Sequence, residues 1–373
     1  MPEAVTSSGP PAGPRIGSLA EVLPGTLSAL TGRTDPIGLA GARRAVVLLI
    51  DGFGYHLLRQ AGPAAPTVGD ILAGRLGRVD EIRCGFPSTT PTSLVSFGTG
   101  ALPGAHGIVG FRVNVPGSDQ VLTHIQWMDE PDPALWQPLS TQFELAGLRT
   151  AVFAPAAYEG SGLTRSAYRG APYHGASLDT LADQILSSDA DLVYGYHPAV
   201  DAAGHRFGIG SPQWLAEVAA VDELLNRLAT ELPAGTALIV TADHGMVDIP
   251  ESGKVDFDAI PGLRSGVRVL TGEARVRYVH TTPGATADVA AAWRAVLGPE
   301  PLILTREEAV DTGWYGEVAP AHLPRIGDLV VVCQGAQAVV CATTEPLEAM
   351  LVGYHGAISP AETGIPLIVV PAR

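Results

Sequence analysis

The chain has little lysine and little charge. Lys254 is its only lysine, and charged residues make up 16% of the 373 residues. The formal net charge is -15, so the surface lacks the cations that sequence-independent binding to DNA or RNA requires. A nucleic-acid polymer is therefore disfavoured as a partner. A small phosphate-bearing substrate is still allowed, because bound metal ions reverse the charge of a site locally.

Cysteine is also scarce, which bears on disulfides and on metal binding. Cys84, Cys333 and Cys341 form an odd set without the spacing of a cysteine metal site. We expect them to be small buried apolar residues. Cys333 and Cys341 would face each other across a hairpin, so a disulfide between them is an open alternative that a reducing compartment disfavours.

Long apolar runs are absent, which bears on location. No stretch approaches the roughly 18 apolar residues of a membrane span. The first residues turn rich in glycine and proline instead of pairing a basic start with an apolar run, so no signal peptide is expected. These features predict a cytoplasmic protein without a membrane partner, and they leave its oligomeric state open.

Apolar residues make up 46% of the chain and are concentrated in short continuous runs. Such runs are typical of parallel strands that are buried on both faces, and helical patterns lie between them. The alternation predicts an α/β fold with a mostly parallel central sheet sandwiched by helices. The expected strands are 45–51, 150–154, 191–196, 237–243 and 365–370, and the expected helices include 19–30, 178–186 and 212–232.

One segment breaks this alternation. Residues 254–347 combine strand-like pieces with a single helix, so we expect a small α+β subdomain inserted into a core formed by 42–253 and 348–373. Residues 1–41 are expected to be a lead-in. Within the insertion the expected strands are 266–270, 274–280 and a hairpin of 327–333 with 336–341, and the expected helix is 285–297.

Several side chains able to bind metal follow the predicted strands. Asp51 and Asp243 each end a strand, His244 follows directly, and Asp201 lies just past a third strand. Ligands of α/β sheets gather beyond the carboxyl ends of the strands, where these residues would meet. Adjacent ionisable groups at a buried strand end are costly unless they are paired or bound to metal.

Two histidines extend this set. His205 stands four residues after Asp201, on the same face of a helical turn, a spacing that equally suits an ordinary ion pair. His355 has Gly353 and Gly356 close by, and such glycines allow the backbone to turn tightly around a ligand.

Thr90 is the candidate nucleophile. It precedes Pro91, which suits the first position of a helix, so Thr90 is expected to be the N-cap. Its role is then either capping alone or facing an anion bound at the helix N-terminus. A threonine hydroxyl is a poor nucleophile until it loses its proton, and a divalent metal brings this about at neutral pH.

Together these residues can form two three-residue metal sites with a hydroxyl between them, which suits metal-assisted attack on phosphorus. A dinucleotide-binding alternative at Asp51-Gly-Phe-Gly54 is rejected, because the third glycine of that fingerprint is missing.

The order of these motifs resembles the alkaline phosphatase superfamily, and within it the type I phosphodiesterase/nucleotide pyrophosphatase family. The resemblance runs from residue 46 to about residue 370. It is carried by Leu-Ile-Asp51-Gly-Phe-Gly, Phe86-Pro-Ser-Thr-Thr90, Asp201-Ala-Ala-Gly-His205, Asp243-His244-Gly245 and Gly353-Tyr-His355-Gly356.

The resemblance implies two divalent metal ions, usually zinc, with manganese or iron as alternatives. One ion would be held by Asp201, His205 and His355. The other would be held by Asp51, Asp243 and His244. Thr90 would touch the second ion and form a covalent phospho-threonine with a small phosphate-ester substrate such as a nucleotide, beneath the inserted subdomain as a cap.

Two departures from the family pattern concern the substrate. Ser93 stands where the family often has an asparagine that holds a phosphoryl oxygen, and Thr89 stands where lysine is common. The segment after Thr90 lacks the sulfatase pattern, which disfavours sulfate esters. Phosphomonoesterases of the superfamily use an additional cation, for which the candidates are Arg83, Arg112 and Arg206.

We therefore expect hydrolysis of phosphodiester or pyrophosphate bonds, with a phosphomonoesterase or phosphonate hydrolase as the alternative and a phosphotransferase such as a mutase as a further one. A protein that has lost its activity is disfavoured, because no expected ligand is missing. The region 110–175 contains aromatic residues that either build a leaving-group pocket or pack in the core: Trp127, Trp136, Phe143 and Tyr158.

Overall fold

The computed structural model describes residues 16–373. The predictions made for residues 1–15, including the absence of a signal peptide, lie outside this part of the chain. Over the described residues, every helix is too short or too polar to cross a membrane. The cytoplasmic location stays a prediction.

A seven-stranded sheet forms the centre of the described chain, with the order β2-β17-β8-β1-β7-β5-β6. Pairing is parallel from β8 through β1, β7 and β5 to β6, and antiparallel where β17 meets β8 and β2. The mostly parallel sheet predicted from the sequence is thus confirmed. Its strands are β1 (Arg44–Ile50), β2 (Arg78–Arg83), β5 (Thr150–Ala154), β6 (Tyr173–Gly175), β7 (Leu192–His197), β8 (Thr236–Thr241) and β17 (Gly364–Val370).

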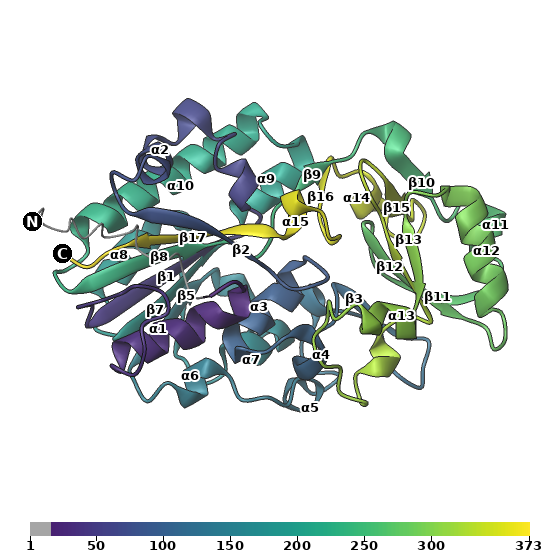
Figure 1. Cartoon of the computed structure of the whole chain (residues 1–373), viewed down its shortest axis with the longest axis horizontal. Coiled ribbons are helices and arrows are strands. Elements are labelled where there is room, and N and C mark those ends of the chain that lie inside the picture. Colours follow the sequence, from purple (N-terminus) through teal and green to yellow (C-terminus); the bar gives the residue numbers. More distant parts are fainter. Residues whose placement is uncertain (1–15) are drawn as a thin grey trace, which may run out of the picture.

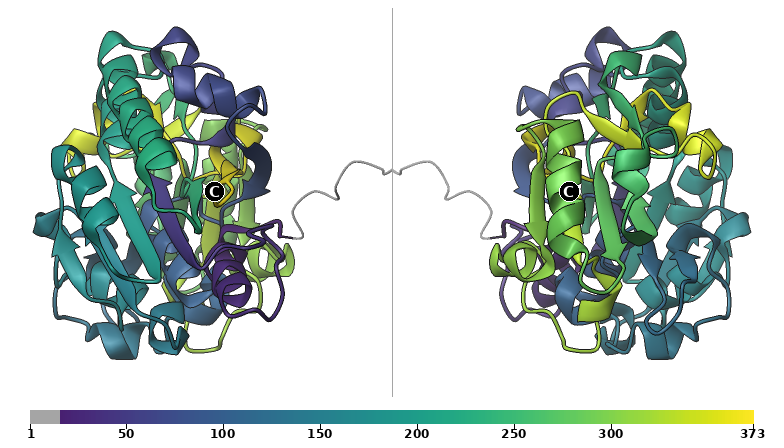
Figure 2. Two further views of the ribbon diagram at one scale, coloured as in Figure 1. Left: turned by 90° about the vertical axis from the view of Figure 1, so that its left-hand side faces the viewer. Right: turned by 90° about the vertical axis from the view of Figure 1, so that its right-hand side faces the viewer.

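Helices cover both faces of this sheet (Figure 1). On one face lie α2 (Pro66–Leu72), α8 (Leu178–Ser187), α9 (Ala199–Phe207) and α10 (Pro212–Glu231), and on the other lie α1 (Val22–Leu30), α3 (Thr90–Thr99) and α7 (Gly162–Tyr168). Figure 2 shows α10 and α1 on opposite sides of the strands in its left view. The predicted sandwich is present.

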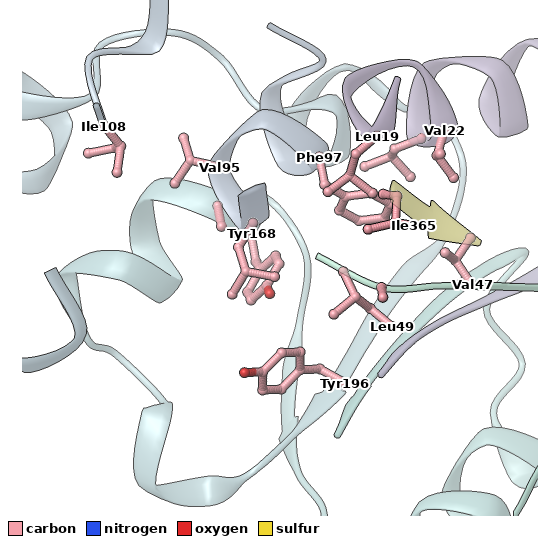
Figure 3. Packing of buried hydrophobic residues seen from close by; sticks show 14 of the residues in the cluster. Leu19, Val22, Val47, Leu49, Val95, Phe97, Ile108, Tyr168, Tyr196 and Ile365 are labelled. Atoms are coloured by element: carbon pink, nitrogen blue, oxygen red, sulfur yellow. The ribbon is translucent and has the colours of Figure 1, made fainter. Parts of the chain in front are cut away.

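A hydrophobic core lies against each face of the large sheet, which explains why its strands are continuous apolar runs in the sequence. Successive side chains of a strand point to opposite faces, so Val46 and Leu48 of β1 belong to one cluster, whereas Val47 and Leu49 belong to the other. Figure 3 shows the second cluster, in which Val47 and Leu49 lie near Phe97 of α3. Both sets are buried, so no polar alternation marks the strand.

The smaller sheet has the order β11-β12-β14-β13 and is antiparallel. Trp293 of α12 packs on one face, while Tyr278 and Val330 on the other face join the core of the large sheet. Figure 1 places this sheet at the right end of the molecule, with α12 on its outer side. Its elements are β11 (Val267–Glu273), β12 (Val276–Thr281), β13 (Leu302–Thr305), β14 (Leu329–Val332), α11 (Pro261–Arg264) and α12 (Thr286–Leu297).

The segment 254–347 therefore has the expected α+β character, and its bounds as a subdomain stay a prediction. The expected hairpin of 327–333 with 336–341 is wrong. Both edges of β14 are already taken by β12 and β13, so β15 (Ala338–Val340) pairs instead with β10 (Lys254–Asp256), in parallel. Accordingly Cys333 and Cys341 are both free thiols, and both are buried as the sequence predicted, whereas Cys84 is only partly buried.

Short elements complete the fold and connect the two sheets. β9 (Val247–Asp248) pairs with β16 (Gly353–Tyr354), which draws the segment after β8 against the loop that contains His355. The remaining ones are β3 (Arg112–Asn114), β4 (Val121–Thr123), α4 (Pro103–His106), α5 (Pro133–Trp136), α6 (Gln142–Leu145), α13 (Arg306–Asp311), α14 (Pro346–Ala349) and α15 (Pro360–Thr363).

A buried ion pair joins the smaller sheet to the segment before β17. Arg275 donates to Glu362 through Nε at 3.0 Å and through Nη2 at 2.8 Å, and both side chains are fully buried. Glu362 also accepts a hydrogen bond from the Ala357 amide at 3.0 Å, in the loop that follows His355. The pair therefore fixes the position of the smaller sheet relative to that loop.

We expect Arg275→Met to lower the free energy of unfolding by about 3–5 kcal/mol, because it leaves the Glu362 carboxylate buried without a cation. Urea unfolding followed by circular dichroism measures this change. The control is Arg149→Met, which removes an exposed pair with Asp189 and Asp191 and should change stability far less. Equal effects of the two substitutions would contradict the role assigned to Arg275.

Candidate metal centre

The predicted ligands meet at the carboxyl ends of the parallel strands. Asp51 follows β1, and Asp243 and His244 follow β8, the neighbouring strand. Asp201 and His205 lie on α9, which follows β7 on the other side of β1. His355 enters from the loop after β16. Three adjacent strands thus deliver five of the residues to one edge of the sheet.

The first group surrounds the Thr90 hydroxyl. His244 Nε2 lies 3.4 Å from Asp51 Oδ1 and 3.4 Å from Asp243 Oδ2. Thr90 Oγ1 lies 3.1 Å from His244 Nε2 and 3.5 Å from Asp51 Oδ1. Asp51, Asp243 and His244 are all buried. The four side chains therefore converge on one point.

The second group lies beside the first. His205 Nε2 is 3.2 Å from Asp201 Oδ2 and 3.1 Å from His355 Nε2, and His355 Nε2 is 3.9 Å from Asp201 Oδ1. The rings of His244 and His355 stack with their centroids 3.6 Å apart, which brings the two groups into contact.

All three histidines are oriented by backbone carbonyls. The Nδ1 atoms of His205, His244 and His355 lie 2.7, 3.0 and 2.8 Å from the carbonyl oxygens of Gly353, Gly245 and Ser88. A proton on each Nδ1 leaves Nε2 as a lone pair directed into the centre, the arrangement of metal-binding histidines. The Nε2 atoms of His205 and His355 lie 3.1 Å apart, so both can serve as donors to one metal ion.

Two carboxylate oxygens in the centre have no hydrogen-bond partner. They are Asp201 Oδ1 and Asp243 Oδ2, and both are buried. The other oxygen of Asp243 accepts hydrogen bonds from the amides of Gly52 and His244, each at 3.0 Å. Buried polar atoms are normally paired, so the two remaining oxygens are free to bind an ion.

Charge repulsion in the centre leads to the same conclusion. Burial raises the pKa of Asp51 well above its usual range, and the nearby Asp243 and Asp201 add to the increase. Burial also lowers the pKa of His355 well below its usual value, with a further decrease from His244. Buried carboxylates that repel one another, and a neutral imidazole at His355, are stabilised by bound cations.

The residues therefore fit divalent metal ions. One atom from each of Asp51, Asp243 and His244 lies within 4.8 Å of the others, and the same holds for Asp201, His244 and His355. The nitrogen and oxygen donors suit zinc and also manganese or iron.

The helix start at Thr90 differs from the prediction. α3 begins at Thr90 itself, and Thr89 is the N-cap, with extended φ of -138° and ψ of 147°. The amide of Ser93 donates to the Thr89 carbonyl at 3.0 Å, which sets the first turn. Pro91 occupies the second position, where its missing N–H is also no loss. Thr90 is therefore not the N-cap residue, and it lines the cavity.

Of Ser93 and the three candidate arginines, only one lines the cavity beside the candidate metal ligands. Ser93 is fully buried in α3 and is outside the lining of the cavity, so the expected contact with substrate gains no support. Arg83 donates to the Thr363 hydroxyl at 2.9 Å, and Arg206 lies over the ring of its neighbour Phe207. Of the three, Arg112 alone lines the cavity.

A cavity of about 1020 Å³ opens at the candidate metal ligands and extends beneath the smaller sheet. Its walls include Leu94, Phe111, Ile125, Tyr158 and Phe257. The volume is at the upper end of the range for small-molecule sites. Substrate can therefore reach Thr90 from this space.

Of the four aromatic residues singled out in the sequence, Tyr158 lines the cavity and is 42% exposed. Trp127, Trp136 and Phe143 are buried in the core. Core packing therefore accounts for three of the four.

Sequence reasoning missed two residues beside the centre. The Tyr196 hydroxyl donates to Asp51 Oδ2, and Glu273 Oε2 lies 3.7 Å from His355 Nδ1. Tyr196 lies in a strand that ends at the site, and that position was a usable signal. Glu273 lies at the end of β11, and no motif marks it. Burial raises the pKa of Glu273 well above its usual value, and Glu348 increases it further.

Known structures share this fold. Murine ectonucleotide pyrophosphatase/phosphodiesterase 5 superposes with a TM-score of 0.68 at 20% identity, covering 87% of each chain. Phosphonoacetate hydrolase from Sinorhizobium meliloti, in complex with phosphonoformate, gives a TM-score of 0.67 at 19% identity, covering 88% of this chain and 90% of the other. An inactive variant of the murine protein was solved in complex with AMP. The fold is that of the alkaline-phosphatase-like proteins.

The sequence comparison gives the family. The profile of type I phosphodiesterase/nucleotide pyrophosphatase matches residues 45–358, so the chain belongs to this family. An uncharacterized pyrophosphatase/phosphodiesterase from Schizosaccharomyces pombe is 27% identical over 57% of this chain and 47% of its own length. Human ectonucleotide pyrophosphatase/phosphodiesterase family member 7 is 29% identical over 37% of this chain and 33% of its own. The chain thus spans half or less of these relatives.

We expect His355→Ala to lower the metal content from about two ions per chain to about one, because it removes a donor from one group only. Inductively coupled plasma mass spectrometry on protein dialysed against zinc gives this number. The control is His174→Ala, which removes an exposed histidine that stacks on Phe153 away from the centre. Unchanged metal content in His355→Ala would contradict the assignment.

Proposed function

We propose that the chain is a metal-dependent hydrolase of phosphodiester or pyrophosphate bonds that works through a covalent phospho-threonine. The observation that carries this proposal is the placement of the Thr90 hydroxyl. It lies 3.1 Å from His244 Nε2 and 3.5 Å from Asp51 Oδ1, at the start of a helix and facing a cavity large enough for a nucleotide-sized molecule.

Six side chains would hold the two metal ions, for which zinc is the proposed metal. Asp51, Asp243 and His244 would hold the ion nearer to Thr90. Asp201, His205 and His355 would hold the other. When bound, the ions supply Lewis acidity that lowers the pKa of the Thr90 hydroxyl and neutralises charge on the phosphoryl oxygens.

The chain's own groups then carry out two displacements. Thr90 Oγ1 attacks phosphorus, the bond from phosphorus to the leaving oxygen breaks, and the leaving group departs as an alcohol with the threonine proton. Water then attacks the phospho-threonine, releases a phosphate monoester and returns the hydroxyl. The first-turn amides of α3, where Thr90 lies, favour the negative charge of the phosphoryl group.

The surrounding residues keep this geometry in place. Tyr196 donates to Asp51 Oδ2, which leaves Oδ1 directed at Thr90. The Gly353 and Ser88 carbonyls keep the Nε2 atoms of His205 and His355 directed inward. These contacts preorganise the site before substrate arrives.

The substrate proposed is a small phosphate ester, consistent with the AMP complex of the murine protein. The same donor set would serve a phosphomonoesterase or a phosphonate hydrolase. Relative rates on matched substrates therefore decide among these activities.

We expect Thr90→Ala to lower kcat on bis(p-nitrophenyl) phosphate by about three orders of magnitude or more, because the nucleophile is lost. Metal content should stay the same. Thr90→Ser retains a hydroxyl and should recover part of the rate. The matched control is Thr92→Ala, which removes a buried hydroxyl two residues further along α3. A near-normal rate for Thr90→Ala would exclude the covalent route.

A further inference from the structure

Arg112 is the one lysine or arginine that lines the cavity, over the residues that the structure describes. Its guanidinium is already paired on both sides. Nη1 forms an ion pair with Glu345, and Nη2 forms one with Glu348. The three side chains are only 12–15% exposed, so solvent screens these pairs weakly. Arg112 is therefore not free to bind a substrate anion.

Both glutamates are themselves held in place. Glu345 forms a second ion pair, with Arg277, at 2.9 Å. Arg277 is fully buried, and its Nε donates a hydrogen bond to the Val339 carbonyl. Glu348 Oε1 accepts a hydrogen bond from the Ala274 amide at 2.9 Å. We call Arg112, Arg277, Glu345 and Glu348 the charge lock. Its connections to the smaller sheet fix the carboxylates in position.

The remaining charges on the cavity wall are negative. Besides the candidate metal ligands, Asp258 joins Glu345 and Glu348 in lining the cavity, so three carboxylates face one guanidinium. A leaving group with negative charge would find no unpaired cation on this wall, because its one guanidinium is already held by Glu345 and Glu348, and that is costly in a partly dry site.

The rest of the wall suits an uncharged group. Leu347 is 77% exposed at the cavity, Ile125 is 50% exposed, and Tyr158 is 42% exposed. Phe257 and Leu270 add apolar surface from the smaller sheet. An apolar leaving group would bury this surface, and each Å² of apolar area removed from water contributes about 25 cal/mol.

We propose that Glu345 and Glu348 determine specificity by withholding Arg112 from the substrate. The site then selects monoanionic phosphodiesters whose leaving group has no negative charge. It discriminates against phosphomonoesters and nucleoside polyphosphates. This proposal rests on the function proposed above, and it narrows the substrate class of that same site.

The test compares the zinc-loaded full chain with Glu348→Gln and Glu345→Gln. Each substitution keeps the shape of the side chain and removes one negative charge from the lock. The substrates are bis(p-nitrophenyl) phosphate and p-nitrophenyl phosphate, which share a leaving group. We expect the ratio of kcat/KM for monoester over diester to rise by about tenfold in either variant.

Two controls separate the charge lock from general effects. Asp189→Asn removes the same charge from a side chain that is 92% exposed, and it should leave the ratio unchanged. The double variant Arg112→Met with Glu348→Gln should lose the gain in monoester hydrolysis, because the guanidinium that the single substitution releases from one of its two carboxylates is then absent. A ratio that stays within about twofold of wild type in both single variants, with their melting temperatures preserved, overturns the proposal.

Binding of AMP by calorimetry distinguishes failure of this proposal from failure of the proposed function. The Kd of AMP for the zinc-loaded protein should fall by about tenfold in Glu348→Gln, because AMP has a dianionic phosphate. Tighter AMP binding without turnover of either ester by wild type would uphold the charge lock and reject the hydrolase. Diester turnover by wild type with unchanged AMP affinity in both variants would uphold the hydrolase and reject the charge lock.

Discussion

The structure depends on gathering three carboxylates and three imidazoles, four of these six side chains buried, where parallel strands end. Asp51 and Asp243 follow neighbouring strands of a sheet covered on both faces, so water cannot solvate their charges. Repulsion among such groups is tolerable only with cations between them. The inward orientation of the histidines, the unpaired carboxylate oxygens and the placement of Thr90 all follow from this one constraint.

The smaller sheet gives the site its second half. Arg275 and Glu362 connect it to the loop after His355, and the charge lock connects it to Arg112 on the core segment. The smaller sheet thus positions the loop after His355, a proposed metal ligand, and the segment that follows this sheet contributes carboxylates to the cavity wall. In the proposed function, the strand ends supply the reaction, and the charge lock sets which leaving groups fit.

Much of the fold and centre could be predicted from the sequence. Continuous apolar runs indicated the central strands, and their ends indicated candidate metal ligands such as Asp51 and Asp243, which the structure brings together. The partner of β15 could not be predicted, because strand pairing depends on which edges are open in space. The sequence predicted Thr90 as the N-cap, one residue later than in the structure. The N-cap is Thr89, because the backbone of Thr89 is extended and that of Thr90 is already helical. Glu273 and the charge lock lack a local signature, because their importance comes from contacts between distant segments.

The stereochemical course at phosphorus tests the central claim most directly. The measurement is hydrolysis of a chiral phosphorothioate diester in isotopically labelled water, with the configuration of the product assigned by phosphorus NMR. Attack by Thr90 followed by attack of water is two in-line displacements, so the account predicts retention of configuration. Inversion would show that water attacks the diester directly, and it would contradict a phospho-threonine intermediate.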